Sequence, residues 1–332
     1  MRVLVTGATG FVGSHIARAL VARGDAVRVL VRRSSRLDNI AGLSCEPVVG
    51  DLLDAGSICD AVAGCDVVYH AAADYRLWSL RPRELYDANV QGSLNVLRAA
   101  ASHRVRRVVY TSTVGVLGIP KDGGPGAEDA PVELADMVGH YKRSKFLADQ
   151  EVRRFSAAEG LPVVTVCPST PVGEGDLKPT PTGKVIVDFL NRRMPAYVQT
   201  GLNLIDVRDV AAGHLLAEER GVPGERYILG NQNMTLQQIL ETLAEITGMR
   251  APRWQMPIWA ALAAGYVDTG ITGCLLRREP RVPIEGVRMA RKMMFFDSSK
   301  AVRELGLPQS PVRDALARAV QWYRENGYAV SE

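Results

Sequence analysis

Two side chains that could exchange protons, Tyr141 and Lys145, lie four residues apart. They would share one face of a helix if the segment that begins near residue 139 is helical. This spacing is common and by itself identifies no chemistry. Here, however, it follows three hydroxyl residues, Thr111, Ser112 and Thr113, which come directly after a strand expected at 105–110. Because open α/β sheets bind ligands at the carboxyl ends of their strands, we expect these five residues to form one site.

The first fifteen residues predict a phosphate-binding turn. An apolar run at 3–5 is typical of a buried parallel strand, and the apolar spacing of a helix resumes at residue 11. A glycine turn between them aims backbone N–H groups and the positive end of a helix dipole at one point, which suits a pyrophosphate. The spacing is G-x-x-G-x-x-G, and an ordinary tight turn is the alternative. The dinucleotide contacts predicted here are Gly7, Thr9, Gly10, Phe11, Val12 and Gly13.

The residues after the next apolar run, 26–31, bear on the choice of cofactor. Arg32 lies about twenty residues beyond the glycines, where an acidic residue would bind the ribose 2′-hydroxyl of NAD. Arginine instead forms forked hydrogen bonds with phosphate oxygens, although a solvated basic loop would have the same composition. We therefore expect NADP(H) rather than NAD, with Arg32 and Arg36 at the 2′-phosphate.

Other strand ends supply further candidates. Asp51 could accept a hydrogen bond from adenine while Leu52 packs on the ring, or Asp51 could be an acid at a helix N-terminus. The alanines 71–73, directly after a strand at 66–70, leave room for the cofactor's diphosphate and ribose. Asn89, inside a helix expected over 83–101, either holds the backbone near the site or is a satisfied core amide.

Composition sets limits on the class of protein. With 47% hydrophobic and 23% charged residues and a net charge of +4, the chain resembles an ordinary soluble protein. Its basic residues are scattered, which does not favour nucleic acid, and we expect no signal peptide and no membrane-length apolar stretch. Five dispersed cysteines without C-x-x-C spacing indicate a reducing compartment, so we expect the cytoplasm and no metal site.

The alternation of apolar runs and helical patterns predicts an α/β fold, a doubly wound parallel sheet of the Rossmann type. We expect this domain over 1–168, with 203–232 returning to it. Residues 169–202 and 233–332 would form a smaller, mostly helical substrate lobe.

Together the motifs resemble the extended short-chain dehydrogenase/reductase family, also called the NAD-dependent epimerase/dehydratase family. The matching segments are 6–13, 50–52, 70–72, 111–113 and 141–145, completed by Pro168 and 205–210. The segment 27–32 resembles the dihydroflavonol 4-reductase branch, which uses NADP. The segments 73–78, 140–145 and 295–301 are similar to bacterial hopanoid-associated sugar epimerases. The family usually has Ser at the position of Thr113. Threonine keeps the hydroxyl group of serine and adds a methyl group.

The resemblance implies a mechanism. Tyr141 would exchange a proton with a substrate oxygen while the nicotinamide exchanges a hydride with the same carbon. Lys145 would lower the phenol pKa, about 10 in water, and hold the nicotinamide ribose, and Thr113 would bond to the substrate oxygen. Substrate contacts would be Asp74, Tyr75, Trp78 and Thr113. The remaining cofactor contacts would be Asp51, Leu52, Ala71, Ala72, Ala73, Asn89, Thr111, Ser112, Tyr141, Lys145, Pro168 and Thr170.

Three functions remain open: a carbonyl reductase using NADPH, a sugar epimerase or dehydratase without net cofactor turnover, and a non-catalytic dinucleotide-binding regulator. Arg32 favours the reductase, since cells hold NADP mostly reduced. A regulator would be expected to lack Tyr141 or Lys145.

Two surfaces suggest partners. The helices expected near 83–101 and 141–158 carry more apolar residues than one face needs, and in this family such helices often pair into a four-helix bundle, so we expect a homodimer. The segment 257–276 is apolar apart from Asp268 and is followed by Arg277, Arg278 and Arg281. It is either a packed helix or a peripheral contact with the inner membrane surface that admits a lipid-linked substrate.

Overall fold

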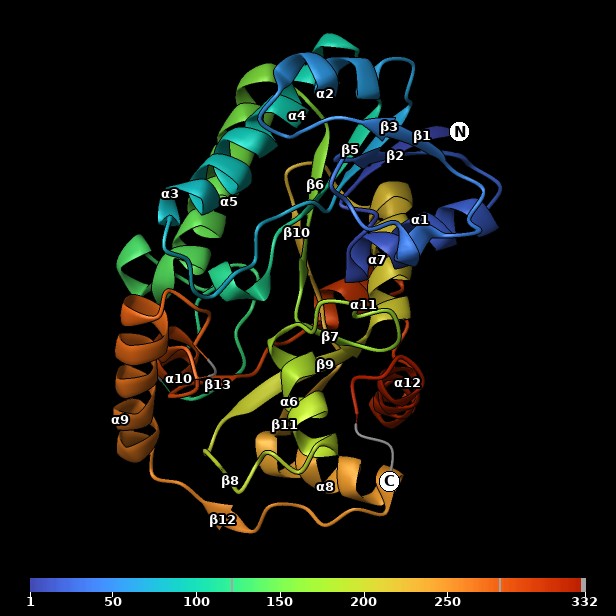
Figure 1. The fold of residues 1–332 in the computed structure, drawn as a ribbon. Coiled ribbons are helices and arrows are strands. Elements are labelled where there is room, and N and C mark those ends of the chain that lie inside the picture. The colour runs from blue at the N-terminus through green and yellow to red at the C-terminus, as the bar shows by residue number, and fades with distance from the viewer. Residues whose placement is uncertain (121, 281, 330–332) are drawn as a thin grey trace.

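A parallel sheet of seven strands forms the centre of the computed structural model, which describes residues 1–120, 122–280 and 282–329 (Figure 1). The strand order is β10-β6-β5-β4-β1-β2-β3, so the chain winds outward from β1 in both directions. This is the doubly wound arrangement, and the predicted fold class is confirmed. The strands are β1 (Arg2–Thr6), β2 (Ala26–Val31), β3 (Glu46–Val49), β4 (Val67–His70), β5 (Arg107–Thr111), β6 (Val163–Pro168) and β10 (Arg226–Leu229).

Helices cover both faces of this sheet, and the side chains of β1 alternate between them. Val3 and Val5 pack with α1 (Phe11–Ala22) and α7 (Val207–Arg220). Leu4 packs on the opposite face, with α2 (Ala55–Val62), α4 (Gly92–Ser102) and α5 (Gly139–Glu159). Because both faces are covered, the strands are apolar at nearly every position, as the sequence indicates.

A second layer of structure lies beyond the carboxyl ends of the strands (Figure 1). Its sheet has the order β11-β9-β13, with β7 also paired to β9. The range 203–232 divides between the two sheets: β10 joins the central sheet and α7 covers it, whereas β9 belongs to the small sheet. The domain boundaries stay a prediction. The elements of this part are β7 (Thr170–Val172), α6 (Pro181–Leu190), β8 (Ala196–Tyr197), β9 (Gly201–Asp206), β11 (Gln232–Thr235), α8 (Leu236–Thr247), β12 (Trp254–Gln255), α10 (Ile284–Met289), β13 (Met293–Met294), α11 (Ser299–Leu305) and α12 (Val312–Glu325).

The helix expected over 83–101 is divided into three segments. It begins as α3 (Pro82–Tyr86), continues as the π-helical turn η2 (Asp87–Gln91) and ends as α4. Asn89 lies inside the π-helical turn. Single π turns inside helices are rare and frequent at functional sites, which gives Asn89 a second indication beyond its residue type.

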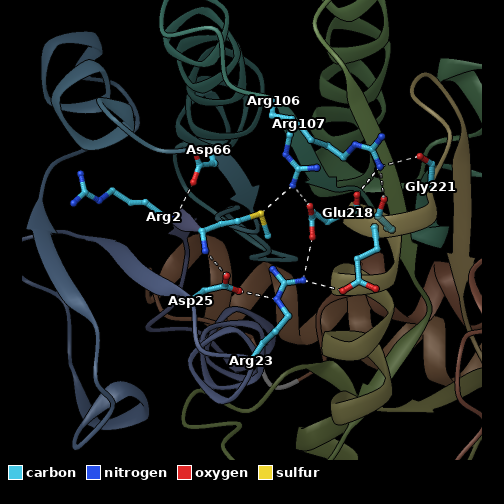
Figure 2. A network of polar contacts seen from close by, with 11 residues as sticks. Arg2, Arg23, Asp25, Asp66, Arg106, Arg107, Glu218 and Gly221 are labelled. Atoms are coloured by element: carbon cyan, nitrogen blue, oxygen red, sulfur yellow. Dashed lines mark hydrogen bonds and ion pairs between the residues drawn. The ribbon is translucent and has the colours of Figure 1, made fainter.

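A polar network occupies the amino end of the sheet (Figure 2). Arg23 donates to Asp25 at 2.7 Å and to Glu218 at 3.0 Å, and Arg106 also pairs with Glu218. Arg107 donates to the backbone carbonyl of Gly221 at 3.1 Å. These contacts connect α1 and β5 to α7, and they lie at the end of the sheet opposite the predicted site.

One long apolar helix corrects the expectation that the chain has no membrane-length stretch. Among the described residues, the continuous helix α9 (Ile258–Asp268) and η5 (Thr269–Leu275) is long and apolar enough to cross a membrane, judged by length and composition only. Only 17% of these residues are buried, so the helix is not part of the core. Arg281, expected beyond its end, lies outside the described residues.

Candidate active site at the carboxyl ends of the strands

The glycine turn after β1 is built by contacts that only glycine permits. Gly7 has a φ of +77°, and a Cβ added there would lie 2.7 Å from the backbone nitrogen of Ala72. A Cβ on Gly13 would lie 2.2 Å from the carbonyl oxygen of Gly7, so this glycine lets α1 pack against the turn. Gly10 caps α1 without any side-chain hydrogen bond, and the first turn carries no acidic residue. The turn therefore fits a pyrophosphate at the helix N-terminus.

The alanine segment after β4 lies directly against this turn. Thr6 accepts a hydrogen bond from the Ala72 N–H at 3.2 Å and contacts Nδ1 of His70 at 2.7 Å. Burial lowers the pKa of His70 to about 3, so its imidazole is neutral, and its Nε2 lies 3.0 Å from Ser93 Oγ. The neutral imidazole thus holds the small-residue segment at the glycine turn.

The arginines after β2 differ from one another in their contacts. Arg36 pairs with Asp38 at 3.1 Å while its side chain stays 72% exposed. Arg32 and Arg33 are exposed, and the described residues offer neither side chain an ion pair. Arg32 thus stays a candidate for the 2′-phosphate. Arg33 is a second candidate that the sequence analysis did not name, and Arg36 is already paired with Asp38.

The adenine candidates lie after β3. Asp51 is exposed, and its carboxylate accepts a hydrogen bond from the Leu53 N–H at 2.9 Å. The cap of α2 is Asp54, which removes the alternative role for Asp51 as a helix-capping acid. Leu52 packs against α4, because a Cβ added to Gly92 of that helix would lie 2.9 Å from the Cβ of Leu52.

Tyr141 and Thr113 meet at the opposite end of the site. Thr113 follows β5 and accepts a hydrogen bond from the Gly115 N–H at 3.1 Å. Its side chain lies beside the phenol of Tyr141, which belongs to the first turn of α5. Burial raises the pKa of Tyr141 to about 12. Without a dinucleotide the phenol is therefore protonated at neutral pH. The lowering of this pKa by Lys145 and a bound nicotinamide ring stays a prediction.

Lys145 is buried one turn further along α5 and points at β5. Its Nζ donates to the carbonyl oxygen of Thr111 at 2.9 Å and to the Tyr110 hydroxyl at 3.3 Å. Burial lowers the pKa of Lys145 to about 8, partly opposed by the charge of Asp149. The Thr111 hydroxyl turns away from the site, to His214 Nε2 at 2.9 Å.

Asn89 joins the two sides of the site. Its amide donates to Ser144 Oγ and to the carbonyl oxygen of Asp74, both at 2.9 Å, and it accepts from the Asp74 N–H at 2.8 Å. It is a satisfied buried amide, and it also holds the backbone of residue 74 against the helix that carries Tyr141. Asn89 therefore fits both alternatives that the sequence left open, the satisfied core amide and the residue that holds the backbone near the site.

The other predicted contacts are placed as follows. Asp74 is paired with Arg76, and the Tyr75 hydroxyl donates to the Lys178 carbonyl at 3.3 Å. Trp78 contacts η5, since a Cβ on Gly273 would lie 3.0 Å from its Nε1. The remaining cofactor candidates lie at strand ends: Ser112 is buried after β5, Pro168 ends β6 and Thr170 opens β7.

Lys142 is a residue that the sequence reading missed. It follows Tyr141, and burial, together with the charge of Lys292, lowers its pKa to about 8. Its Nζ lies 3.9 Å from Met294 Sδ. Within the run 142–145, the sequence does not indicate that Lys142 is half-buried while Arg143 is exposed. In the described part of the chain, no three His, Cys, Asp or Glu side chains gather as a metal site would require.

Comparison with known proteins identifies the family. A model of the NAD dependent epimerase/dehydratase family matches residues 3–230. A Synechocystis protein named as a dihydroflavonol 4-reductase is 48% identical, covering 99% of this chain and 96% of that protein. Sterol demethylase protein B of Methylococcus capsulatus is 38% identical, covering 98% and 99%. A nucleoside-diphosphate-sugar epimerase from Pseudomonas aeruginosa has a similar structure, with a TM-score of 0.82, 30% identity and 99% coverage of both chains.

These matches span the glycine turn, the arginine-bearing strand end and the Tyr141 helix alike. The family binds nicotinamide dinucleotides, and its members include reductases and epimerases. The chain is therefore an enzyme-type member of the NAD-dependent epimerase/dehydratase family of extended short-chain dehydrogenases/reductases.

Proposed function

We propose that this protein is an NADP(H)-dependent oxidoreductase that reduces a carbonyl group on an apolar or lipid-linked small molecule. The observation that carries the proposal is the placement of Tyr141 and Lys145 in the first two turns of α5, at the carboxyl end of β5 where Thr113 follows. Reduction of a carbonyl needs a proton donor at the new oxygen, and a phenol whose pKa is raised to about 12 is protonated at neutral pH. Oxidation of an alcohol, the reverse reaction, would first require this phenol to lose its proton.

The residues present fit a nicotinamide dinucleotide. The glycine turn would hold the pyrophosphate and Lys145 the nicotinamide ribose, while Thr113 and Tyr141 would contact the substrate oxygen. When bound, the nicotinamide supplies a hydride. Thr113 would orient the carbonyl oxygen, and Tyr141 would deliver a proton to it.

The preference for NADP(H) is supported by Arg32 and Arg33, whose guanidinium groups are exposed beside the end of β2. Arg36 can also turn toward a phosphate, because its ion pair with Asp38 is exposed and such pairs stabilise a protein little. Three arginines would then be available to one phosphate group.

The apolar substrate class is supported by a relative and by the surroundings of the site. The relative at 38% identity carries a sterol in its name. Trp78 and Leu77 lie between the site segment at residue 74 and the apolar elements η5 and α10. A hopanoid-type substrate, which joins a triterpene to a sugar-derived chain, would combine an apolar body with an oxygenated end.

Epimerisation of a sugar nucleotide is the second candidate, favoured by the epimerase that is 30% identical over the whole chain. An epimerase oxidises and re-reduces its substrate, so its cofactor is regenerated within one turnover. The two functions therefore differ in cofactor stoichiometry.

The decisive experiment mixes purified protein with NADPH and a panel of ketones and aldehydes, including sterol ketones, and separately with nucleotide sugars. Loss of NADPH absorbance equal to product formed supports the reductase. A converted nucleotide sugar without loss of absorbance would assign the epimerase instead. The Tyr141→Phe variant is the control, because it should form neither product.

We also propose a homodimer built on α4 and α5. These helices lie side by side in direct contact, and in this family such helices often pair into a four-helix bundle. Light scattering at micromolar concentration tests the proposal, and a monomer would contradict it.

A further inference from the structure

A continuous apolar stripe lies exposed along α9 and η5, at the edge of the molecule (Figure 1). Its members recur every three or four residues, which places them on one side of the helix. Trp259 is 71% exposed and Leu275 76% exposed, at opposite ends of the helix. We name as the apolar stripe the exposed residues Trp259, Ala263, Tyr266, Val267, Gly270, Ile271 and Leu275.

The other side of this helix is packed against the protein. A Cβ on Gly265 would lie 3.3 Å from Val287 of α10, and Gly273 lies against Trp78. Asp268 accepts hydrogen bonds from Thr272 at 2.6 Å and from the Val282 N–H at 2.8 Å. A helix fixed along one side by polar and close apolar contacts cannot cross a bilayer on its own, but it can lie in the plane of an interface.

Positive charge surrounds the apolar stripe. Residues 250–292 hold eight lysines and arginines against three acidic residues, a net charge of +5, whereas the whole chain has +4. Glu279 is neutralised by Lys184 at 2.7 Å, and Glu285 packs against Gly139. Three exposed basic residues are placed at the stripe: Arg277 and Arg278 follow the end of its helix, and Arg288 donates to the Tyr266 hydroxyl at 2.7 Å.

This charge decides between the two occupants that an apolar helix face invites. A second copy of the chain, docked stripe to stripe, would bring two positively charged rims together. An anionic bilayer complements the same rim and also receives exposed tryptophans such as Trp254 and Trp259 at the level of its headgroups.

We propose that the apolar stripe docks this protein on the surface of an anionic lipid bilayer, with the helix lying parallel to the membrane. The docked helix contacts one segment that borders the active site, and α10, against which it packs, contacts another. Trp78 contacts η5, and Glu285 of α10 contacts Gly139, the residue at which the helix carrying Tyr141 begins. An amphiphilic substrate could therefore pass from the bilayer to the site without entering bulk water.

The inference goes beyond the proposed function and is tested without an activity assay. Full-length protein is co-sedimented with phosphatidylcholine vesicles and with vesicles that contain 30% phosphatidylglycerol, at about 0.1 M salt. We expect binding to the anionic vesicles at least tenfold tighter than to the neutral ones. Raised salt should weaken that binding, because the Debye length falls from about 10 Å at 0.1 M to 3 Å at 1 M.

Two variants separate the apolar and the charged contributions. Ile271→Asn combined with Leu275→Asn should abolish binding to both kinds of vesicle. Arg277→Gln combined with Arg278→Gln should weaken binding to anionic vesicles more than tenfold, since each basic residue at such a surface contributes about fivefold. All four side chains are exposed, so folding should be preserved, and circular dichroism with thermal unfolding checks this.

A matched control changes an exposed apolar and an exposed basic residue elsewhere, Val222→Asn with Arg303→Gln, and should bind like the parent. Parent protein that stays in the supernatant with both vesicles would overturn the proposal, as would stripe variants that bind like the parent. A stripe-dependent dimer without vesicle binding, seen by light scattering, would assign the face to a second copy instead.

Discussion

The two ends of the central sheet differ in how their polar side chains are partnered. At the amino end, the charged groups of Arg23, Asp25, Arg106 and Glu218 pair with one another (Figure 2). At the carboxyl end, glycines and alanines keep side chains away from the glycine turn, and the reactive groups contact uncharged partners. The polar groups of the amino end are thus paired within the protein, whereas the carboxyl end leaves backbone N–H groups and side chains available to a ligand.

The difference is also electrostatic. Glu218 is 2% exposed, and two guanidinium groups compensate the cost of burying its charge. Lys145 is equally buried, but its Nζ contacts a carbonyl oxygen, a hydroxyl oxygen and the Tyr110 ring, and the charge of Asp149 only partly opposes the burial that lowers its pKa to about 8. Partly compensated burial of this kind is typical of functional sites, because an arriving anionic ligand supplies the missing charge.

The largest expected effect is at the carboxyl end. Tyr141→Phe should reduce turnover about a thousandfold, since a positioned proton donor contributes about 10²–10⁴. Cofactor affinity and the free energy of unfolding should change little, because the phenol contacts neither the glycine turn nor the polar network. Steady-state kinetics and urea unfolding measure the two effects. Parental turnover in this variant would remove Tyr141 from the proposed mechanism.

The matching change at the amino end should affect stability instead. Glu218→Gln leaves two arginines without their shared buried anion. We expect about 2 kcal/mol of destabilisation, below the usual cost of breaking a buried pair because both arginines are partly exposed. Turnover of the folded enzyme at 25 °C should equal that of the parent. A variant of parental stability and reduced turnover would show that the two ends are not separate in role.

A smaller effect is expected at the rim of the site. Arg32→Asp should reverse the preference for NADPH over NADH by more than tenfold, because a carboxylate binds the ribose 2′-hydroxyl and repels a 2′-phosphate. Arg36→Gln should have a weaker effect, since Arg36 is already paired with Asp38. Cofactor titration followed by fluorescence measures both. Equal affinities of the parent for the two cofactors would contradict the arginine argument.

The comparison also explains what could be predicted from sequence. The glycine turn, Thr113 and Tyr141 were predictable because their residue types sit at strand and helix ends, where local spacing alone places them. The pairing of Arg23 with Glu218 joins positions 195 residues apart, and no local pattern encodes such a contact. The sequence also did not indicate that β9 belongs to the small sheet and not to the central one.

Burial of individual charged groups was the other limit. Lys142 and Arg143 are adjacent basic residues, and only the packing around α5 makes Lys142 half-buried and leaves Arg143 exposed. The raised pKa of Tyr141 was not predicted for the same reason, since the resemblance supplied a neighbouring cation but not the degree of burial. The exposure of α9 likewise depends on which elements pack against it, and composition favoured a packed helix equally well.

The smallest expected effect concerns pH and distinguishes Lys145 from the paired cations of the amino end. The pKa of Lys145 is about 8 in the folded protein and 10.5 in the unfolded chain. Between these values the unfolded chain binds more protons, so this group makes stability rise as pH increases from 8 to 10.5. Cofactor affinity should fall over the same range, by up to about tenfold per pH unit above the pKa, because the neutral amine no longer attracts the anionic dinucleotide.

Lys145→Met should remove the pH dependence of both stability and cofactor affinity. Arg23→Met should leave both pH dependences unchanged, since arginine does not titrate in this range. Cofactor titrations and urea unfolding at pH 7.5, 8.5 and 9.5 measure them. Parallel pH profiles for the parent and Lys145→Met would show that this lysine keeps its charge through compensation, as Arg23 does, and would erase the contrast between the two ends of the sheet.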